Sequence, residues 1–149
     1  MMKNIDTKVT LDAIQVHQHA STWEEAIQIA ADPLVSKKSI KPLYIDAMID
    51  SVKKLGPYIV LMPGFALAHA APSSQVIRSD ISVAVFDDPI VFHSNNDPVY
   101  VVMCLACTDH VSHVKRLQSI AQLFLDDEEL VSKIRTCGIK QELQLLLSK

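Results

Sequence analysis

The chain is poor in the residues that mark several classes of protein. It has 3 glycines and 7 prolines among 149 residues, too few for a collagen-like or linker-like composition. Its 3 cysteines, an odd number in a chain large enough to fold without staples, favour reduced thiols over disulfides. The longest wholly apolar run, Val99–Cys107, has nine residues, whereas a membrane-spanning helix needs roughly 20. The sequence therefore predicts neither a disulfide scaffold nor a membrane insertion.

Charge is also sparse and nearly balanced. Fourteen basic and 17 acidic residues give a formal net charge of −3, and no basic block could follow a phosphate backbone. The first residues, Met-Met-Lys-Asn-Ile-Asp-Thr, lack the apolar core of a signal peptide. The hydrophobic share of 49% and the charged share of 21% are typical of a globular chain. We expect one cytoplasmic domain over residues 1–149 that binds no nucleic acid.

Apolar residues at helical spacing predict helices near both ends. Ser21 or Thr22 is expected to cap the first helix, and the second should run from about Pro42 to Lys54 and end at Gly56-Pro57. In the last third, Thr108 or Asp109 should cap a helix, Asp126–Glu129 should open another that ends near Cys137, and Ile139–Leu147 should form the last. The expected inner faces are Leu43, Ala47, Met48 and Val52 in the second helix and Val114, Leu117, Ala121 and Phe124 after Asp109.

The middle of the chain has the pattern of strands. Short apolar runs occur at Tyr58–Met62, Phe65–Leu67, Ile81–Phe86 and Ile90–Phe92, the last two separated by an expected turn at Asp87-Asp88-Pro89. Tyr100–Ala106 is apolar on both alternating faces, which is typical of a central strand covered on both sides. The prediction is one α/β domain, with helices first, a mixed sheet in the middle and helices last.

Several polar or sulfur-bearing groups have an ordinary structural explanation. Cys104 and Cys107 lie in the expected central strand, where residues three apart point to opposite faces, so the thiols cannot converge. We interpret both, and Cys137, as core residues. The pair His17 and His19 lacks a third metal ligand and is expected to be solvated, and His93 is expected to be a loop residue.

Two further histidines suggest phosphoryl chemistry. His69 follows a short strand in a setting of small residues, and His113 lies in the first turn of the helix after the central strand, on the same side as His110. Ligands of open α/β sheets collect beyond the carboxyl ends of strands, and helix N-termini offer unpaired N–H groups to anions. One neutral imidazole could attack phosphorus while the other hydrogen-bonds the phosphoryl oxygens. The sequence has no Walker loop, so it gives no support for a nucleotide kinase.

The motifs resemble a known family. Tyr44-Ile45-Asp46-Ala47-Met48, Gly56-Pro57-Tyr58 and Met62-Pro63-Gly64-Phe65-Ala66-Leu67-Ala68-His69 are similar to the enzyme IIA component of the bacterial phosphoenolpyruvate-dependent sugar phosphotransferase system, mannitol/fructose type. The Gly-Pro-Tyr and Asn96-Asp97-Pro98-Val99 segments are most similar to the ascorbate-specific branch. The resemblance covers nearly the whole chain.

The resemblance implies a fold, a site and partners. The fold would be an α/β/α sandwich with a mixed central sheet of about five strands between helical layers. His69 would be the phosphohistidine nucleophile and His113 the donor to the phosphoryl oxygens. The phosphocarrier HPr would supply the phosphoryl group, and a cysteine of a IIB component would receive it during uptake of a sugar such as ascorbate or a pentitol. No cofactor and no metal are implied, and a homodimer is left open.

The chain departs from the family pattern in two places. The family has Pro-His-Gly around its nucleophile, whereas this chain has Ala68-His69-Ala70. If the glycine served partner docking or a positive φ, Ala70→Gly should do no harm and should raise the transfer rate, the melting temperature or neither. Mannitol-type members carry an arginine near the end of the second helix, close to the place of Ser51 here, and its charge would be supplied by Arg78 or Lys115, or not at all.

Two other functions stay open at this stage. The first is a regulatory module of the same fold that signals by its phosphorylation state. The second, from another class, is a non-enzymatic metal-binding domain that uses His110 and His113.

Overall fold

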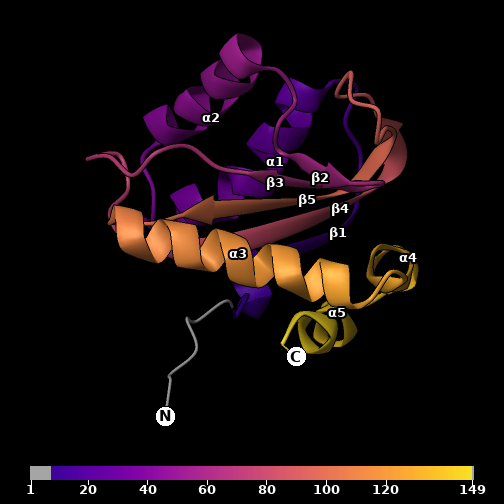
Figure 1. The fold of residues 1–149 in the computed structure, drawn as a ribbon. Coiled ribbons are helices and arrows are strands. Elements are labelled where there is room, and N and C mark those ends of the chain that lie inside the picture. Colours follow the sequence, from indigo (N-terminus) through magenta and orange to yellow (C-terminus); the bar gives the residue numbers. More distant parts are fainter. Residues whose placement is uncertain (1–7, 149) are drawn as a thin grey trace.

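A mixed sheet forms the middle of the fold (Figure 1). The computed structural model describes residues 8–148. Within them the strands are β1 (Ile14–Gln18), β2 (Val60–Met62), β3 (Phe65–Ala68), β4 (Asp80–Ile90) and β5 (Val99–Ala106), in the spatial order β1-β4-β5-β3-β2. β1 pairs parallel with β4 and β3 pairs parallel with β5, whereas β4–β5 and β2–β3 are antiparallel.

Helices cover both faces of this sheet (Figure 1). One face packs against α1 (Trp23–Ser36) and α2 (Pro42–Leu55), and the other against α3 (His110–Asp126), α4 (Leu130–Thr136) and α5 (Lys140–Leu147). A short 3-10 helix, η1 (Leu11–Ala13), precedes β1. Because β5 has two neighbours and two covered faces, its alternating side chains are nearly all buried, as its unbroken apolar run predicts. The α/β/α sandwich with a mixed five-stranded sheet is confirmed.

Local signals in the sequence explain where the helices begin and end. Thr22 caps α1 by accepting a hydrogen bond from the N–H of Glu25, and Asp109 caps α3 by accepting one from Ser112. Gly56 ends α2 at a φ of 87°, a conformation that residues with a Cβ rarely adopt. These helix boundaries were predicted correctly.

Two expectations about strands were wrong. Helices do not come first, because β1 precedes α1 and forms one edge of the sheet. Asp87-Asp88-Pro89 is not a turn between two strands, because β4 continues to Ile90 with an irregular register after Val85. Proline is tolerated at such an irregularity because its missing N–H breaks no regular ladder bond.

The inner faces of two helices were predicted only in part: Met48, Val52 and Phe124 are buried as expected, whereas Leu43 and Val114 are not. Leu43 is 60% exposed, and α2 buries Tyr44 and Ile45 in addition to the two expected residues. Val114 is 39% exposed, and α3 buries His113 and Ile120 in addition to the expected Phe124. A shift of one residue turns a side chain by about 100° around a helix, so the packing partners decide the inner face where apolar residues are adjacent.

The topology places two chain segments at one edge of the sheet. Parallel pairing sets Ala68, the last residue of β3, beside Cys104 in β5, so both strands end at the same edge. His69 follows β3 directly, and α3 begins just after β5, near the tip of its arrow in Figure 1. None of the helices within residues 8–148 has the length and apolar character that crossing a membrane requires.

Candidate functional site

The structure brings His69 and His113 together. Their ring centroids are 5.5 Å apart, with 53° between the ring planes. His69 is half-buried at the end of β3, and His113, on the inner face of α3, is only 5% exposed. Two residues 44 positions apart in the sequence thus form one pair because parallel strands deliver both segments to the same edge.

The backbone determines which nitrogen of His69 carries the proton. Nδ1 of His69 lies 2.8 Å from the carbonyl oxygen of Leu67. A carbonyl can only accept, so Nδ1 is the protonated, donating nitrogen. The neutral ring therefore keeps its lone pair on Nε2, which is the nitrogen left for attack on phosphorus.

Tyr58 packs against the same histidine. Its ring meets that of His69 edge-on, with centroids 5.4 Å apart and planes at 90°, and its hydroxyl donates to the His69 carbonyl over 3.4 Å. The His69 ring therefore contacts one aromatic ring from the segment after α2 and one imidazole from α3. These contacts restrict the ring rotation and orient Nε2.

Burial keeps both histidines neutral. Loss of water lowers the pKa of His69, and its hydrogen bond to Leu67 opposes this shift only partly. Loss of water also lowers the pKa of His113, and the neighbouring His69 and His110 lower it further. At neutral pH both rings are uncharged, which is the form a nitrogen nucleophile needs.

The N-terminus of α3 is less open to anions than the sequence indicated. The Asp109 side chain already accepts from the N–H of Ser112, and its carbonyl accepts from that of His113. Its carboxylate also places a negative charge at this helix end. His110 is exposed, unlike His113, although both lie in the first turn. His113, rather than free helix N–H groups, is the group that approaches His69.

The structure contradicts both explanations offered above for position 70, namely a positive φ and contact with a docking partner. Ala70 is not among the residues with positive φ, so a glycine would relieve no strain there. Its methyl group is also buried, with 6% of the residue exposed, and it packs in the core cluster beneath α1 and α2. The methyl group therefore supports the core and does not face a docking partner.

Ala70→Gly is accordingly expected to destabilise the protein. The variant loses a buried methyl group and gains freedom in the unfolded chain, which together lower the free energy of unfolding by about 1–2 kcal/mol. Urea unfolding measures this loss. Ala71→Gly, at the exposed neighbouring position, is the matched control and should show the smaller, chain-entropy part alone. Equal stability of Ala70→Gly and the wild type would contradict the packing role.

Neither expected substitute for the family arginine is shown next to the histidines. The Arg78 guanidinium donates to the carbonyl of Lys37 over 2.8 Å and to Oγ of Ser39 over 3.1 Å. Ser39 in turn donates to Asp80, which also pairs with Lys37. Arg78 thus belongs to a structural network at the start of β4. Lys115 is exposed on α3.

The other candidate groups are structural or solvated, as expected. Cys104 and Cys107 are buried in the two core clusters on opposite faces of the sheet. Burial raises the pKa of each thiol, which makes both unreactive. His17 and His19 are exposed and lie near the carboxylates of Asp87 and Asp88.

His93 is a loop residue, as the sequence predicts. His93 is exposed in the loop after β4. Among residues 8–148, His110 and His113 belong to no group of three or more His, Cys, Asp or Glu side chains that could hold a metal ion.

Sequence reasoning missed two tyrosines of the site. Tyr58 contacts the His69 ring, and Tyr44 hydrogen-bonds the backbone of Ala70. The only available signal was that a tyrosine on the buried face of a helix needs a partner for its hydroxyl. Both residues occur in motifs quoted for the family resemblance, but their spacing does not reveal what they touch.

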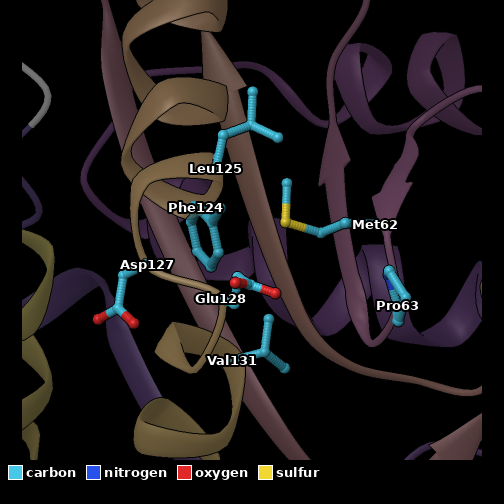
Figure 2. A pocket seen from close by; sticks show the side chains of 7 residues that line it. All are labelled: Met62, Pro63, Phe124, Leu125, Asp127, Glu128 and Val131. Atoms are coloured by element: carbon cyan, nitrogen blue, oxygen red, sulfur yellow. The ribbon is translucent and has the colours of Figure 1, made fainter.

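A groove of about 280 Å³ lies at the opposite end of α3 (Figure 2). The side chains of Met62 and Leu125 lie on opposite walls, and Glu128 lies on the segment that follows α3. Its remaining lining residues are Pro63, Phe124, Asp127 and Val131. β3 and α3 both lead from this region to the histidines, so the groove is separate from the site.

Comparison with known proteins identifies relatives along the whole chain. Residues 8–149 match the family described as "Phosphoenolpyruvate-dependent sugar phosphotransferase system, EIIA 2". The ascorbate-specific EIIA component of this system from Escherichia coli K12 is 33% identical over 150 residues, which cover 99% of this chain and 97% of that protein.

Solved structures share the fold. The mannitol-specific cryptic phosphotransferase enzyme IIA from Escherichia coli has a TM-score of 0.84 and 28% identity, and the match covers 98% of this chain and 99% of that chain. The enzyme IIA of mannitol from Escherichia coli, solved in complex with phosphorylated enzyme IIB, has a TM-score of 0.80 and 23% identity, with 95% and 97% covered. The latter likeness shows the fold alone.

Proposed function

The chain belongs to the EIIA type-2 family of the phosphoenolpyruvate-dependent sugar phosphotransferase system, and from this premise we propose that it carries the phosphoryl group on Nε2 of His69. Members of this family are phosphotransferase components. The observation that carries the assignment is the hydrogen bond from Nδ1 of His69 to the Leu67 carbonyl, which leaves Nε2 with the lone pair. His113 is proposed as the hydrogen-bond donor to the phosphoryl oxygens.

The proposed transfer needs no group beyond the two histidines. Nε2 of His69 attacks phosphorus, the Nε2–P bond forms, and the N–P bond of the phosphohistidine donor breaks as its electron pair returns to the donor ring. Negative charge arrives beside His113, whose pKa is lowered by burial and by His69. The negative charge of the phosphoryl group stabilises an N–H donor on His113. This attraction offsets the loss of hydration that lowers the pKa of His113. Transfer to a thiolate sulfur breaks the same Nε2–P bond.

We propose phospho-HPr as the donor and a IIB component as the acceptor. Both are proteins, so Nε2 has to be reached from a surface and not from an enclosed pocket. Exposed apolar side chains accompany the site: Val111 and Val114 flank His113 on α3, and Tyr58 covers His69. Exposed apolar area of this kind suits transient protein docking. The acceptor proposed here corresponds to the protein bound in one solved structure of the same fold, a complex with phosphorylated enzyme IIB.

The substrate that we propose for the complete system is ascorbate or a related sugar acid. The support is the relative named for ascorbate, which is 33% identical to this chain. A regulatory role remains the second candidate, with the same phosphohistidine. We further propose that residues 1–149 form one domain that acts in the cytoplasm, and light scattering of the purified protein will distinguish a monomer from a homodimer.

Incubation with phosphoenolpyruvate, enzyme I and HPr tests the proposed function. Intact-protein mass spectrometry should show the gain of one phosphoryl group, acid-labile and base-stable, as a phosphohistidine is. Omission of HPr should abolish the gain, and this omission is the control for the donor. Absence of the gain with active HPr would contradict the proposal, and a gain on a residue other than His69 would contradict the site.

The lowered pKa values predict how stability depends on pH. A histidine whose folded pKa lies below its unfolded value of about 6.5 binds fewer protons in the native state, so the free energy of unfolding falls as pH drops below about 6.5. NMR titration should place the midpoints of both rings below those of the urea-unfolded chain. Urea unfolding at pH 7.5 and 5.5, compared with His69→Gln, should show a weaker pH dependence in the variant. Ring midpoints at or above the unfolded value would contradict the expectation.

A further inference from the structure

The Tyr44 hydroxyl binds both backbone polar atoms of one residue beside the nucleophile. Tyr44 lies in the first turns of α2, fully buried. Its hydroxyl donates to the carbonyl of Ala70 over 2.8 Å and accepts from the N–H of Ala70 over 3.0 Å. The Leu105 carbonyl in β5 lies 3.3 Å from the same oxygen. One hydroxyl has a single hydrogen, so the shorter contact makes Ala70 the main acceptor and the Leu105 carbonyl shares the same hydrogen, while one lone pair accepts from the Ala70 N–H.

The Tyr44 hydroxyl hydrogen-bonds the backbone just beyond the end of the β3–β5 pairing. The pairing of β3 with β5 ends at Ala68 and Cys104, so the backbone of Ala70 lies beyond the strand pairing seen in residues 8–148. The buried N–H and C=O of Ala70 would cost free energy without a partner. Tyr44 supplies both partners from α2, and its contact with Leu105 ties the same point to β5.

His69 is therefore held from both sides. Before it, Ala68 is fixed in the sheet, and after it, Ala70 is fixed by Tyr44. The bond from Nδ1 of His69 to the Leu67 carbonyl spans only two residues, so its length depends on the backbone angles of His69 itself. Those angles cannot change much while both neighbours are held. The tautomer of the ring thus depends on a hydroxyl that does not touch the ring.

We propose that Tyr44 is a positioning residue for phosphoryl transfer: by holding Ala70 it keeps Nδ1 of His69 on the Leu67 carbonyl and Nε2 free for attack. This inference rests on the proposed function of His69. It also gives the segment Ala68-His69-Ala70, which lacks the proline of the family pattern, a restraint on its backbone from α2.

The chemistry of Tyr44 suits a constant restraint. Burial raises the pKa of its phenol, so the hydroxyl stays protonated and keeps its donor throughout the working pH range. It lies against the backbone and is enclosed by the core cluster beneath α1 and α2. Tyr44 therefore acts on the reaction only through the placement of His69.

Tyr44→Phe removes the oxygen and leaves the ring in place. With phospho-HPr as substrate, kcat should fall roughly tenfold while KM stays within about a factor of two, because docking is unchanged and only the placement of Nε2 is lost. In the unphosphorylated protein, ring nitrogen-15 NMR should show His69 moving from the tautomer protonated on Nδ1 to a mixture of both tautomers.

Ser82→Ala is the matched control. Ser82 is fully buried in β4 and donates to the Ala30 carbonyl of α1 over 2.6 Å, so its loss removes a comparable buried bond that involves neither His69 nor Ala70. It should lower the melting temperature and leave kcat and the His69 tautomer unchanged. If Tyr44→Phe behaves like Ser82→Ala in all three measurements, Tyr44 is merely structural and the proposal is wrong.

A second variant covers the case in which Tyr44→Phe does not fold. Site-specific incorporation of 3-fluorotyrosine at position 44, with Tyr58 and Tyr100 left unmodified, makes the hydroxyl a stronger donor without removing it. The Ala70 amide resonance and the His69 ring nitrogen resonances should then shift together, and a shifted amide with an unmoved ring would overturn the proposal. The NMR readouts need no phosphoryl transfer, so they stand or fall separately from the assignment of His69 as phosphoryl carrier, which His69→Ala tests.

Discussion

His69→Ala is expected to abolish phosphoryl acceptance. The substitution removes Nε2, the nitrogen that the bond to Leu67 leaves unprotonated, and no second nucleophile lies in its place. The neighbouring imidazole, that of His113, is only 5% exposed, so a protein donor reaches it less easily than it reaches half-buried His69. Loss of the only nucleophile in covalent catalysis removes the pathway altogether, so the rate should fall by roughly 10⁴-fold or more.

The measurement is the rate of phosphoryl gain from phospho-HPr, followed by mass spectrometry. The fold should survive, because His69 is half-buried and follows β3 rather than belonging to it. Circular dichroism and the melting temperature check this point. His93→Ala, in an exposed loop, is the control for loss of a histidine as such, and it should accept phosphate at the wild-type rate. Full phosphorylation of His69→Ala at the normal rate would exclude His69 as the carrier.

His113→Ala is expected to slow transfer by roughly ten- to a hundred-fold without abolishing it. A charge-assisted hydrogen bond to a phosphoryl oxygen contributes about 1.5–3 kcal/mol, and each 1.4 kcal/mol corresponds to a factor of about ten in rate. The ring of His113 is close enough for this role, with its centroid 5.5 Å from that of His69. Its Nδ1 is buried and finds no hydrogen-bond partner within residues 8–148, so protein acceptors do not use up both ring nitrogens.

Two further variants make the His113 experiment specific. His113→Gln keeps a side-chain N–H donor and should recover part of the lost rate, whereas a purely structural role would give equal losses for Ala and Gln. His110→Ala removes the exposed histidine of the same helical turn and should change the rate by less than about a factor of two. A slow His110→Ala combined with a normal His113→Ala would move the role to His110.

His110 and His113 of α3 show that helical spacing alone does not determine which residue faces the sheet. Positions 110 and 113 share one side of a helix, so the sequence alone could not say which one faces the sheet. The structure buries His113 and exposes His110 because α3 packs with Ile120 and Phe124 inward, and this phase brings His113 over the end of β3. The expected inner position Val114 fails for the same reason.

The sequence by itself determined the features that depend on neighbouring residues. The caps at Thr22 and Asp109, the stop at Gly56 and the buried central strand follow from local hydrogen bonding, backbone freedom and alternation. Through its resemblance to a known family, the motif around His69 also indicated the family and the candidate nucleophile from the sequence alone. The short β1 was missed, because five residues with alternating polarity carry little signal on their own.

Only the tertiary structure decided how His69, the proposed nucleophile, is positioned. The pairing of His69 with His113 requires β3 and β5 to end at one edge, and the neutral state of both rings requires their burial. Nε2 of His69 is left unprotonated because Nδ1 donates to the Leu67 carbonyl over 2.8 Å. The next residue, Ala70, is held by the hydroxyl of Tyr44, which lies 26 positions away in the chain. Such contacts depend on distances between segments far apart in sequence, and residue spacing carries no record of them.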